Sequence, residues 1–408
     1  MTSTHTPMVL DDDFVQDPFT VYRLLRIEAP VREVVMPRGL KVWLVTRYAD
    51  ARDALSHPAV RKDLRPVRHL FDKHHTGTST GGFGADLSAH MLNSDPPDHT
   101  RLRRLVARAF TMRRVELLRP RVEEITENLL DGLSGEVDLT DAFAFPLPVT
   151  VICELLGVPQ ADQDDFRGWT TKLVTARSAQ SVGEAGQAMS VYLHGLIDTK
   201  RANPADDLLS ALVQAEEDGE KLNAVELVSM AFLLLVAGHE TTVNLISNGV
   251  LALLRAPDQL AALRADPALL PGAVEELLRF GSPVNHTTMR YTAEPVEIGG
   301  TTIPEDEFVV VALGSANRDD DRFGDPDTLD VTRSAAGHLS FGHGIHFCLG
   351  APLARLEGQI AIGRLVERFP DLALASDDLR WRNSTLLRGL EELPVRLEGH
   401  TGQQGHTV

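Results

Sequence analysis

The ten residues from Phe341 to Gly350 read FGHGIHFCLG and precede a stretch of helical periodicity that contains Pro352. Gly342 and Gly344 allow a tight loop whose backbone can approach a large planar ligand closely. Cys348 then falls at the start of the helix, where free N–H groups and the helix dipole favour a thiolate. Most lone cysteines are core residues, but the glycine spacing, the histidine two residues earlier and the following helix favour a chemical role here.

A second segment, AGHETT, occupies residues 237–242 in the middle of the longest helical pattern, Asn223 to Leu254. The Thr241 hydroxyl can bond back to the carbonyl of Ala237, which would open the helix locally. Glu240 is an acid in an apolar helix, an unfavourable place unless it is hydrated or paired. Such an acid–alcohol pair suits proton delivery. The alternative is an ordinary core helix that tolerates a few polar residues in this segment.

The cysteine segment resembles the cysteine loop of the cytochrome P-450 superfamily. The resemblance runs from Asp17-Pro18 to the last strands, and two stretches, TMRRVELLRPRVEEI (111–125) and LLVAGHETTVNLI (234–246), are most similar to bacterial enzymes that hydroxylate macrolides and other polyketides. It implies that Cys348 is the axial thiolate ligand of a haem iron. Because no C-x-x-C-H motif is present, this would be haem b held non-covalently.

The resemblance also assigns the surroundings of the haem. It implies that Glu240 and Thr241 deliver protons during dioxygen activation. The residues implied to contact the haem besides Cys348 are Ala237, Phe341, Gly342, Gly350 and, for its propionates, His99, Arg103, Arg290 and His346. Taken alone, the last four would more simply be solvated surface residues, although propionates do need cationic partners.

Glu276 and Arg279 are spaced to pair on one helix face. E-x-x-R alone is common, but its place between AGHETT and the cysteine loop matches the structural ion pair of the family. The family often adds a third partner from a P-x-R-F segment, which here reads Pro326-Asp327-Thr328-Leu329. Arg333 and His338 are the possible substitutes.

Substrate contacts are expected by family analogy at Leu233, Ala237, Val284, Asn285, Thr288 and Leu386, in the 66–90 segment and in the helices between 160 and 202. Between residues 74 and 94 the only acid is Asp86, so selection for an amino-sugar cation is not evident. Apolar residues dominate the other positions, which favours a large, mainly apolar substrate.

The resemblance implies that electrons come from a ferredoxin and its reductase, as in family members without a fused reductase, since the chain has no room for a flavin domain. Arginines on helices expected beside the cysteine could steer an acidic donor, or could be ordinary solvated residues. They are Arg101, Arg104, Arg108, Arg113, Arg114, Arg355 and Arg364.

The bulk composition limits the alternatives. The 408 residues carry 40 basic and 58 acidic side chains, a formal net charge of -18, which argues against a nucleic-acid binder. Two cysteines, Cys153 and Cys348, make a disulfide framework implausible. The N-terminus lacks the apolar core of a signal peptide, and the apolar stretch Met230–Gly238 is too short to span a membrane. We therefore expect a cytoplasmic protein without a membrane anchor.

The elements that must position these residues are mostly helices. The periodicity predicts helices over 19–28, 48–56, 97–109, 112–133, 149–156, 223–254, 271–280 and 350–369, with two more between 160 and 202. A hairpin is expected over 32–46, short strands over 284–311 and a closing strand pair over 385–397. Residues 66–90, rich in Thr, Ser, Gly and His, predict a long loop, either functional or a disordered insertion.

The sequence thus predicts one mainly α domain with small β-sheets (α+β) over 1–408, with flexible ends at 1–16 and 399–408. The haem would lie between the long central helix and the cysteine-loop helix. The predicted function is a monooxygenase acting on a polyketide-like molecule. The alternatives are a peroxide-driven enzyme of the same fold, a haem sensor without turnover, and a haem-free helical protein.

Overall fold

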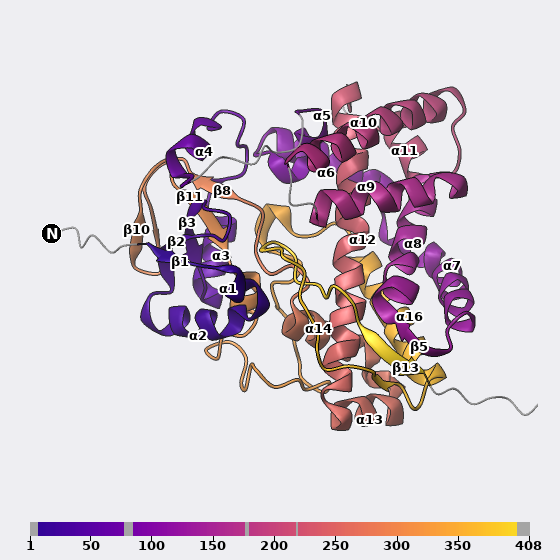
Figure 1. Ribbon diagram of the computed structural model, residues 1–408. Coiled ribbons are helices and arrows are strands. Elements are labelled where there is room, and N and C mark those ends of the chain that lie inside the picture. Colours follow the sequence, from indigo (N-terminus) through magenta and orange to yellow (C-terminus); the bar gives the residue numbers. More distant parts are fainter. Residues whose placement is uncertain (1–6, 77–84, 176–178, 218, 398–408) are drawn as a thin grey trace, which may run out of the picture.

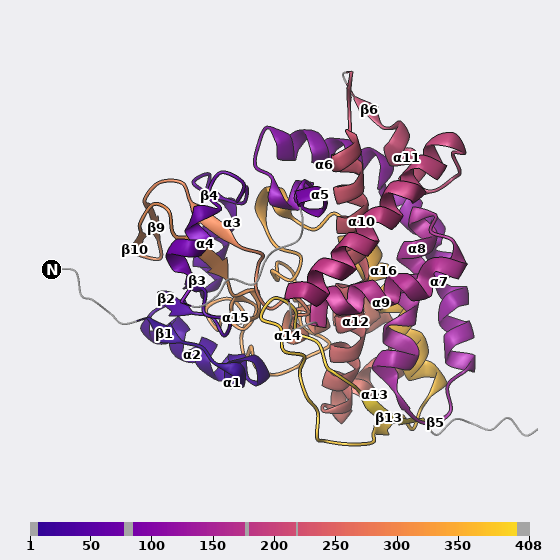
Figure 2. The same cartoon turned by 45° about the horizontal axis from the view of Figure 1, so that its top comes forward.

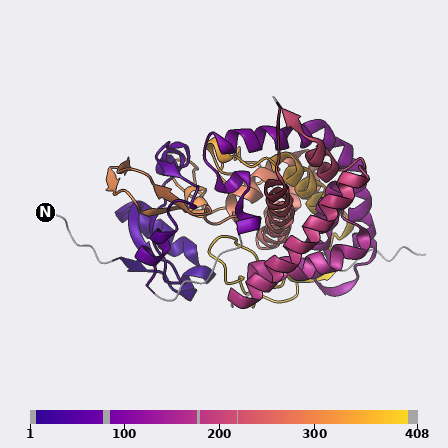
Figure 3. The same cartoon turned by 90° about the horizontal axis from the view of Figure 1, so that it is seen from above.

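The computed structural model describes residues 7–76, 85–175, 179–217 and 219–397. A helical part and a smaller part built on a sheet lie side by side, and α12 (Ala224–Leu254) runs through the helical part (Figure 1). Seen along this helix, the other helices of that part surround it (Figure 3). The predominance of helices with small sheets confirms the predicted fold class.

The helices agree closely with the periodicity of the sequence. Besides α12 they are α1 (Asp12–Gln16), α2 (Pro18–Glu28), α3 (Tyr48–Ser56), α4 (His69–His74), α5 (Ala85–Ser88), α6 (Asp98–Ala109), α7 (Met112–Asp131), α8 (Pro146–Leu156), α9 (Gln163–Thr175), α10 (Ala179–Ala202), α11 (Leu208–Gln214), α13 (Pro257–Ala265), α14 (Leu270–Gly281), α15 (Leu313–Ala316) and α16 (Ala351–Arg368). Of these, α1, α4, α5, α11, α13 and α15 were not predicted.

The central helix begins at a capping box, in which the Asn223 side chain and Glu226 satisfy each other's backbone N–H groups. Its buried side chains point in all directions because α8, α10, α14 and α16 pack around it. By length and composition α12 could cross a membrane, but it is largely buried here, as expected of a core helix.

The largest sheet has six strands in the order β1-β2-β3-β11-β8-β4. Its strands are β1 (Met8–Val9), β2 (Val31–Val35), β3 (Lys41–Val45), β4 (Val60–Arg61), β8 (Arg290–Thr292) and β11 (Phe308–Val311). The predicted hairpin is β2 and β3, which pair in antiparallel register around Gly39 at φ 82°. Because β11 pairs with both β3 and β8, the N-terminal hairpin forms one layer with β8 and β11, two strands from after residue 284.

The remaining strands form small sheets. They are β5 (Gly135–Asp138), β6 (Glu216–Glu217), β7 (Glu220–Lys221), β9 (Val296–Ile298), β10 (Thr301–Ile303), β12 (Ala373–Leu374) and β13 (Pro394–Leu397). The sequence predicted that residues 385–397 form two strands that pair with each other, and this prediction was wrong. Only β13 is a strand there, and it pairs with β12 and β5 instead. Figure 2 shows β13 beside β5.

Two further expectations about loops differ from the structure. Residues 66–90 are not one long loop: α4 buries Leu70 and His74, and α5 follows at the other end, while residues 77–84 lie outside the described residues. At the N-terminus, β1 pairs with β2 and α1 buries Phe14, so residues 8–16 are part of the fold rather than a flexible end. The expected flexible segment 399–408 lies outside the described residues.

Candidate active site

The cysteine loop has the tight geometry that its glycines allow. Gly342 and Gly344 both have φ of 72°, in the left-handed region that favours glycine. A Cβ on Gly344 would lie 3.0 Å from the carbonyl oxygen of Leu55 in α3, so the loop packs closely on that helix. The N–H of Cys348 donates to the carbonyl of Phe341 over 2.9 Å and closes the loop.

The thiol of Cys348 lies directly before α16. The residue is exposed, yet desolvation by the surrounding protein atoms raises the pKa of its thiol. Backbone N–H groups of Gly350 and Ala351, and the charges of Arg103 and Arg355, act in the opposite direction. These donors stabilise the thiolate form, the form in which cysteine binds a metal.

The AGHETT segment forms the local bond predicted from its sequence. The Thr241 hydroxyl donates to the carbonyl of Ala237 over 2.9 Å. Ala237 is exposed although most of α12 is buried, so accessible space reaches the middle of α12. A small molecule can therefore approach the Thr241 hydroxyl.

Glu240 is paired with a residue that sequence reasoning missed. Its buried carboxylate accepts a hydrogen bond from Arg382 over 3.1 Å, and His239 Nε2 lies 3.6 Å from its other oxygen. Burial acts to raise the pKa of Glu240, but His239 and Arg382 outweigh it and lower the pKa below its ordinary value. Arg382 lies 142 residues further along the chain, so no local pattern in the sequence indicates this pair.

The four residues expected to bind propionates lie close together. The rings of His99 and His346 are 4.4 Å apart, and Arg103 donates to the carbonyl of Phe347 beside the cysteine over 2.7 Å. Burial and nearby Lys62 and Arg290 lower the pKa of His346 to about 2. Arg290 Nε and His346 Nε2 have no hydrogen-bond partner among the described residues.

Lys62, which was not predicted, belongs to the same cluster. It is buried, and its ammonium group donates to the Thr288 hydroxyl. Burial first, and then the charge of Arg290, lower its pKa well below the ordinary value. Burying several basic groups together disfavours their charged forms unless anionic groups neutralise them. The two carboxylates of a haem fit this requirement, and with the Cys348 thiol they define where a haem would be held.

The ion pair expected on α14 is present. Arg279 donates to both oxygens of the Glu276 carboxylate at 2.7 and 2.8 Å, and both side chains are fully buried. Of the two residues considered as a third partner, Arg333 contacts Glu276 at 3.2 Å. His338 instead contacts Glu275 at 3.1 Å.

The residues expected to contact substrate come from three segments. Leu233 and Ala237 lie one turn apart on α12. Val284 bridges to Leu387, and the N–H of Asn285 donates to the carbonyl of Leu386 over 2.8 Å. The stretch from residue 284 to 288 and the turn at Leu386 therefore run side by side.

Individual side chains in these segments differ in their surroundings. Val284, Thr288 and Leu386 are half-buried, whereas Asn285 is buried. The side-chain oxygen of Asn285 lies 3.0 Å from the hydroxyl oxygen of Tyr22 of α2. Its amide is therefore occupied by packing against the N-terminal part of the chain.

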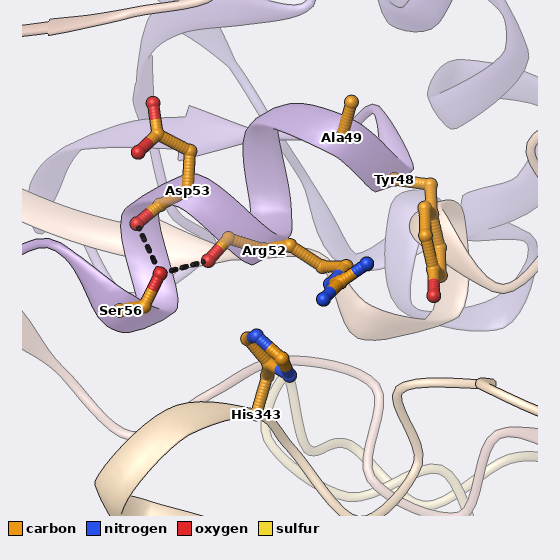
Figure 4. A pocket seen from close by; sticks show the side chains of 6 residues that line it. All are labelled: Tyr48, Ala49, Arg52, Asp53, Ser56 and His343. Carbon is orange, nitrogen blue, oxygen red and sulfur yellow. Dashed lines mark hydrogen bonds between the residues drawn. The ribbon is translucent and has the colours of Figure 1, made fainter.

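A small surface hollow of about 310 Å³ adjoins the outside of the cysteine loop (Figure 4). It is lined by Tyr48, Ala49, Arg52, Asp53 and Ser56 of α3, with His343 of the loop facing the Arg52 guanidinium. None of the predicted site residues lines this hollow. We therefore place the active site on the other side of the cysteine loop, where the Cys348 thiol lies.

Comparisons with known proteins agree with this site. The family model described as Cytochrome P450 matches residues 149–376. Cytochrome P450 107B1 of Saccharopolyspora erythraea is 58% identical over 97% of this chain and 99% of its own length. The cytochrome P450 monooxygenase PikC of Streptomyces venezuelae is 51% identical over 97% and 95%, respectively.

Two further matches extend the likeness. The 6-deoxyerythronolide B hydroxylase of S. erythraea is 47% identical over 97% of this chain and 100% of its own length. The solved structure of the tirandamycin C-bound P450 monooxygenase TamI superposes with a TM-score of 0.90 and 53% identity, covering 96% of this chain and 100% of that one. Proteins of this family bind haem b non-covalently through a cysteine thiolate, the group that the loop, the cationic cluster and the open middle of α12 fit. This chain therefore belongs to the cytochrome P450 family of haem-containing monooxygenases.

Proposed function

We propose that this monooxygenase takes electrons from a ferredoxin and hydroxylates or epoxidises a large, mainly apolar secondary metabolite such as a macrolide or another polyketide. The observation that carries the proposal is the Thr241–Ala237 hydrogen bond beside the accessible middle of α12, with an acid next to it in the chain. The 6-deoxyerythronolide B hydroxylase and the tirandamycin C-bound TamI support the substrate class by the molecules that they act on or bind.

When bound, the haem supplies the dioxygen-activating chemistry, and the protein side chains supply ligation, anchoring and protons. The Cys348 thiolate would ligate the iron. Lys62, His99, Arg103, Arg290 and His346 would bind the propionates and fix the plane of the haem.

Proton delivery falls to the acid–alcohol pair. The Glu240 carboxylate is held ionised by Arg382, which is itself partly open to solvent. On leaving Arg382 it can take up a proton and pass it to the Thr241 oxygen, whose own proton is then available in the accessible space beside Ala237. One oxygen atom of dioxygen enters the substrate and the other leaves as water.

The residues that would bind substrate are Leu233, Ala237, Val284, Thr288 and Leu386, with Asn285 behind them. Their mainly apolar character suits a substrate held by shape and hydrophobic contact with few polar anchors. A cytoplasmic location is part of the proposal and is supported by the burial of α12 within the fold.

The experiment is spectroscopic first and chemical second. The reduced protein exposed to carbon monoxide should show the strongly red-shifted Soret band of thiolate ligation, and Cys348→Ala should abolish that band. Macrolides and related polyketides are then screened for spin-state shifts and for products in the presence of a ferredoxin, its reductase and NADPH. Product formation with peroxide but not with ferredoxin would overturn the electron source. No oxidised product from any polyketide would overturn the substrate class.

A further inference from the structure

Tyr22 of α2 is a fully buried residue whose hydroxyl reaches the segments expected to contact substrate. Its oxygen lies 2.9 Å from His286 Nε2 and 3.0 Å from the side-chain oxygen of Asn285. Phe14 of α1 packs edge-on against the Tyr22 ring and stacks on His286. The N-terminal helices therefore support residues 285 and 286 from behind.

His286 joins this support to the C-terminal turn. Its Nδ1 lies 2.6 Å from the carbonyl oxygen of Thr385, and its backbone N–H donates to the carbonyl of Leu386 over 3.3 Å. The N–H of Asn285 donates to the same Leu386 carbonyl. One histidine thus bonds both to Tyr22 and to the turn that carries Leu386.

The directions of these hydrogen bonds follow from which atoms can donate. The Thr385 carbonyl can only accept, so His286 Nδ1 carries a proton. Burial lowers the pKa of His286 to about 4, which leaves Nε2 unprotonated at neutral pH. The Tyr22 hydroxyl has a single proton for its two neighbours, and the unprotonated Nε2, at 2.9 Å, is the nearer of them. We therefore take Nε2 to accept from the Tyr22 hydroxyl, so removal of this hydroxyl would leave a buried acceptor without a donor.

We propose that Tyr22, acting through His286, is a positioning residue that sets the separation of two substrate-pocket walls, the 284–288 stretch and the turn at Leu386. Without its hydroxyl, the two walls would shift relative to α12 and change which large ligands fit. The proposal rests on the proposed function only in taking these segments as pocket walls, and it needs no knowledge of the natural substrate.

The test compares Tyr22→Phe with Tyr48→Phe in the holoenzyme. Tyr48 donates its hydroxyl to the carbonyl of Gly337 over 2.7 Å, outside the expected pocket, so its variant loses a bond of the same kind elsewhere. Binding of two azoles to the haem iron is measured by the shift of the Soret band. Clotrimazole is large enough to press against pocket walls, whereas imidazole reaches little beyond the iron.

We expect Tyr22→Phe to change the Kd of clotrimazole at least fivefold, with the Kd of imidazole and the carbon monoxide spectrum unchanged. Tyr48→Phe should leave both affinities unchanged. Equal clotrimazole affinity in wild type and Tyr22→Phe would overturn the proposal. So would an equal change for both azoles, because that would indicate a disturbed haem rather than a moved wall.

A double-mutant cycle with His286→Gln tests whether Tyr22 acts through His286. Non-additive effects on clotrimazole affinity are expected, since both substitutions break the same bond. Additive effects would overturn the route through His286. If His286→Gln does not fold, the comparison of the two tyrosine variants still decides. Failure of every polyketide as substrate would overturn the proposed function and leave this azole test intact.

Discussion

Neighbouring threonines in α12 have unlike surroundings although their side chains are identical. Thr241 is half-buried and bonds to Ala237 over 2.9 Å, beside accessible space. Thr242 is buried and lies 3.5 Å from the carbonyl of Gly238. One residue along a helix changes direction by about 100°, so only the first of the pair faces the site.

This contrast gives a matched pair of variants. Thr241→Ala should lower the product formed per NADPH consumed by about tenfold and raise hydrogen peroxide, because the proton donor at the reacting oxygen is lost. Thr242→Ala should keep the wild-type ratio. The measurement is product, peroxide and NADPH in the same reaction. An equal loss of coupling in both variants would show that the effect comes from the helix and not from the Thr241 hydroxyl.

Arg382 controls the ionisation of Glu240. In Arg382→Met the carboxyl stays buried and keeps His239 but loses Arg382, the second of the two partners that lower its pKa, so its pKa should rise from the lowered value. Turnover that needs a protonated Glu240 should then persist to higher pH than in wild type, and the protein should lose about 3 kcal/mol of stability. The check is the pH profile of coupled turnover. Arg382→Lys, which keeps the charge, should retain most of the wild-type profile, and an unshifted profile in Arg382→Met would refute the assignment.

Lys62 is the residue that most directly tests the anion site. Replacing it by Met removes one buried charge, so a haem held by its propionates should be transferred to apomyoglobin about tenfold faster, which corresponds to about 1.4 kcal/mol. Lys73→Met is the control, since Lys73 is exposed and contacts Glu307 at 3.3 Å. Equal transfer rates in both variants would place Lys62 outside the haem site.

At the scale of elements, Glu275 joins three segments around the cysteine. It lies on α14 and accepts two hydrogen bonds from Arg355 of α16, at 2.6 and 2.8 Å, and one from His338 in the loop before the cysteine. Burial acts to raise the pKa of Glu275, but these partners lower it to about 2. The helix that follows Cys348 is therefore clamped to α14 by an ionised carboxylate.

This clamp should make stability depend on acid pH. A carboxyl with a pKa of about 2 in the folded state and 4.5 when unfolded stabilises the fold above pH 4.5, and the contribution is lost as the pH falls towards 2. Glu275→Gln should lose up to about 3 kcal/mol at pH 7. The difference between the urea unfolding midpoints of the wild type and of Glu275→Gln should become smaller as the pH falls below 4.5. Glu116→Gln, which breaks an exposed pair with Arg119, should change the midpoint little at any pH.

The elements that the sequence predicted correctly are those determined by short-range patterns. The bond from Thr241 to Ala237 spans one helical turn. The cysteine loop spans ten residues, and its glycines allow the tight turns. Both features could therefore be predicted. Contacts between distant segments could not: Arg382 reaches Glu240 across 142 residues, and Lys62 reaches Thr288 across 226. Nothing local in the sequence indicates such pairs, because tertiary packing brings them together.

Local composition also misled in one region. Residues 66–90 have the Thr, Ser, Gly and His content of a loop, yet Leu70 is fully buried and the ring of His74 hydrogen-bonds to the carbonyl of Asp306 over 2.9 Å. The short helix α4 is stabilised by these tertiary contacts and not by the propensity of its own residues. The site residues from the 284–288 stretch could likewise be predicted only by resemblance, because tertiary contacts and not local sequence determine their position.

Charge is distributed unevenly over the whole molecule. The chain has a net charge of -18, and several arginines expected to form a basic face are paired with acids. Arg101 contacts Glu226, Arg355 contacts Glu275, and Arg364 lies 3.3 Å from Glu127. These ion pairs reduce the positive charge available to steer an acidic partner. Any steering would therefore depend mainly on the other exposed arginines.

Arg113 tests the proposed steering. It is exposed in the first turn of α7, and Arg113→Glu should slow the second-order reduction by ferredoxin several-fold at low salt. The difference should vanish at high ionic strength, because screening removes interactions between exposed charges. Arg396→Glu on β13 changes the net charge equally and should leave the rate unchanged. The rates are measured by stopped flow. Equal rates for the two variants would exclude the surface around Arg113 as the ferredoxin docking surface.

The long apolar helix at the centre of the molecule has a consequence for biosynthesis. While α12 is still unfolded, its 31 residues resemble a segment that the membrane-insertion machinery would accept. A charged side chain at the centre of such a segment opposes insertion by about 2.5–3.5 kcal/mol. Glu240 lies near that centre and His239 stands beside it, so the acid proposed to serve oxidation would also oppose insertion of an unfolded α12 into a bilayer.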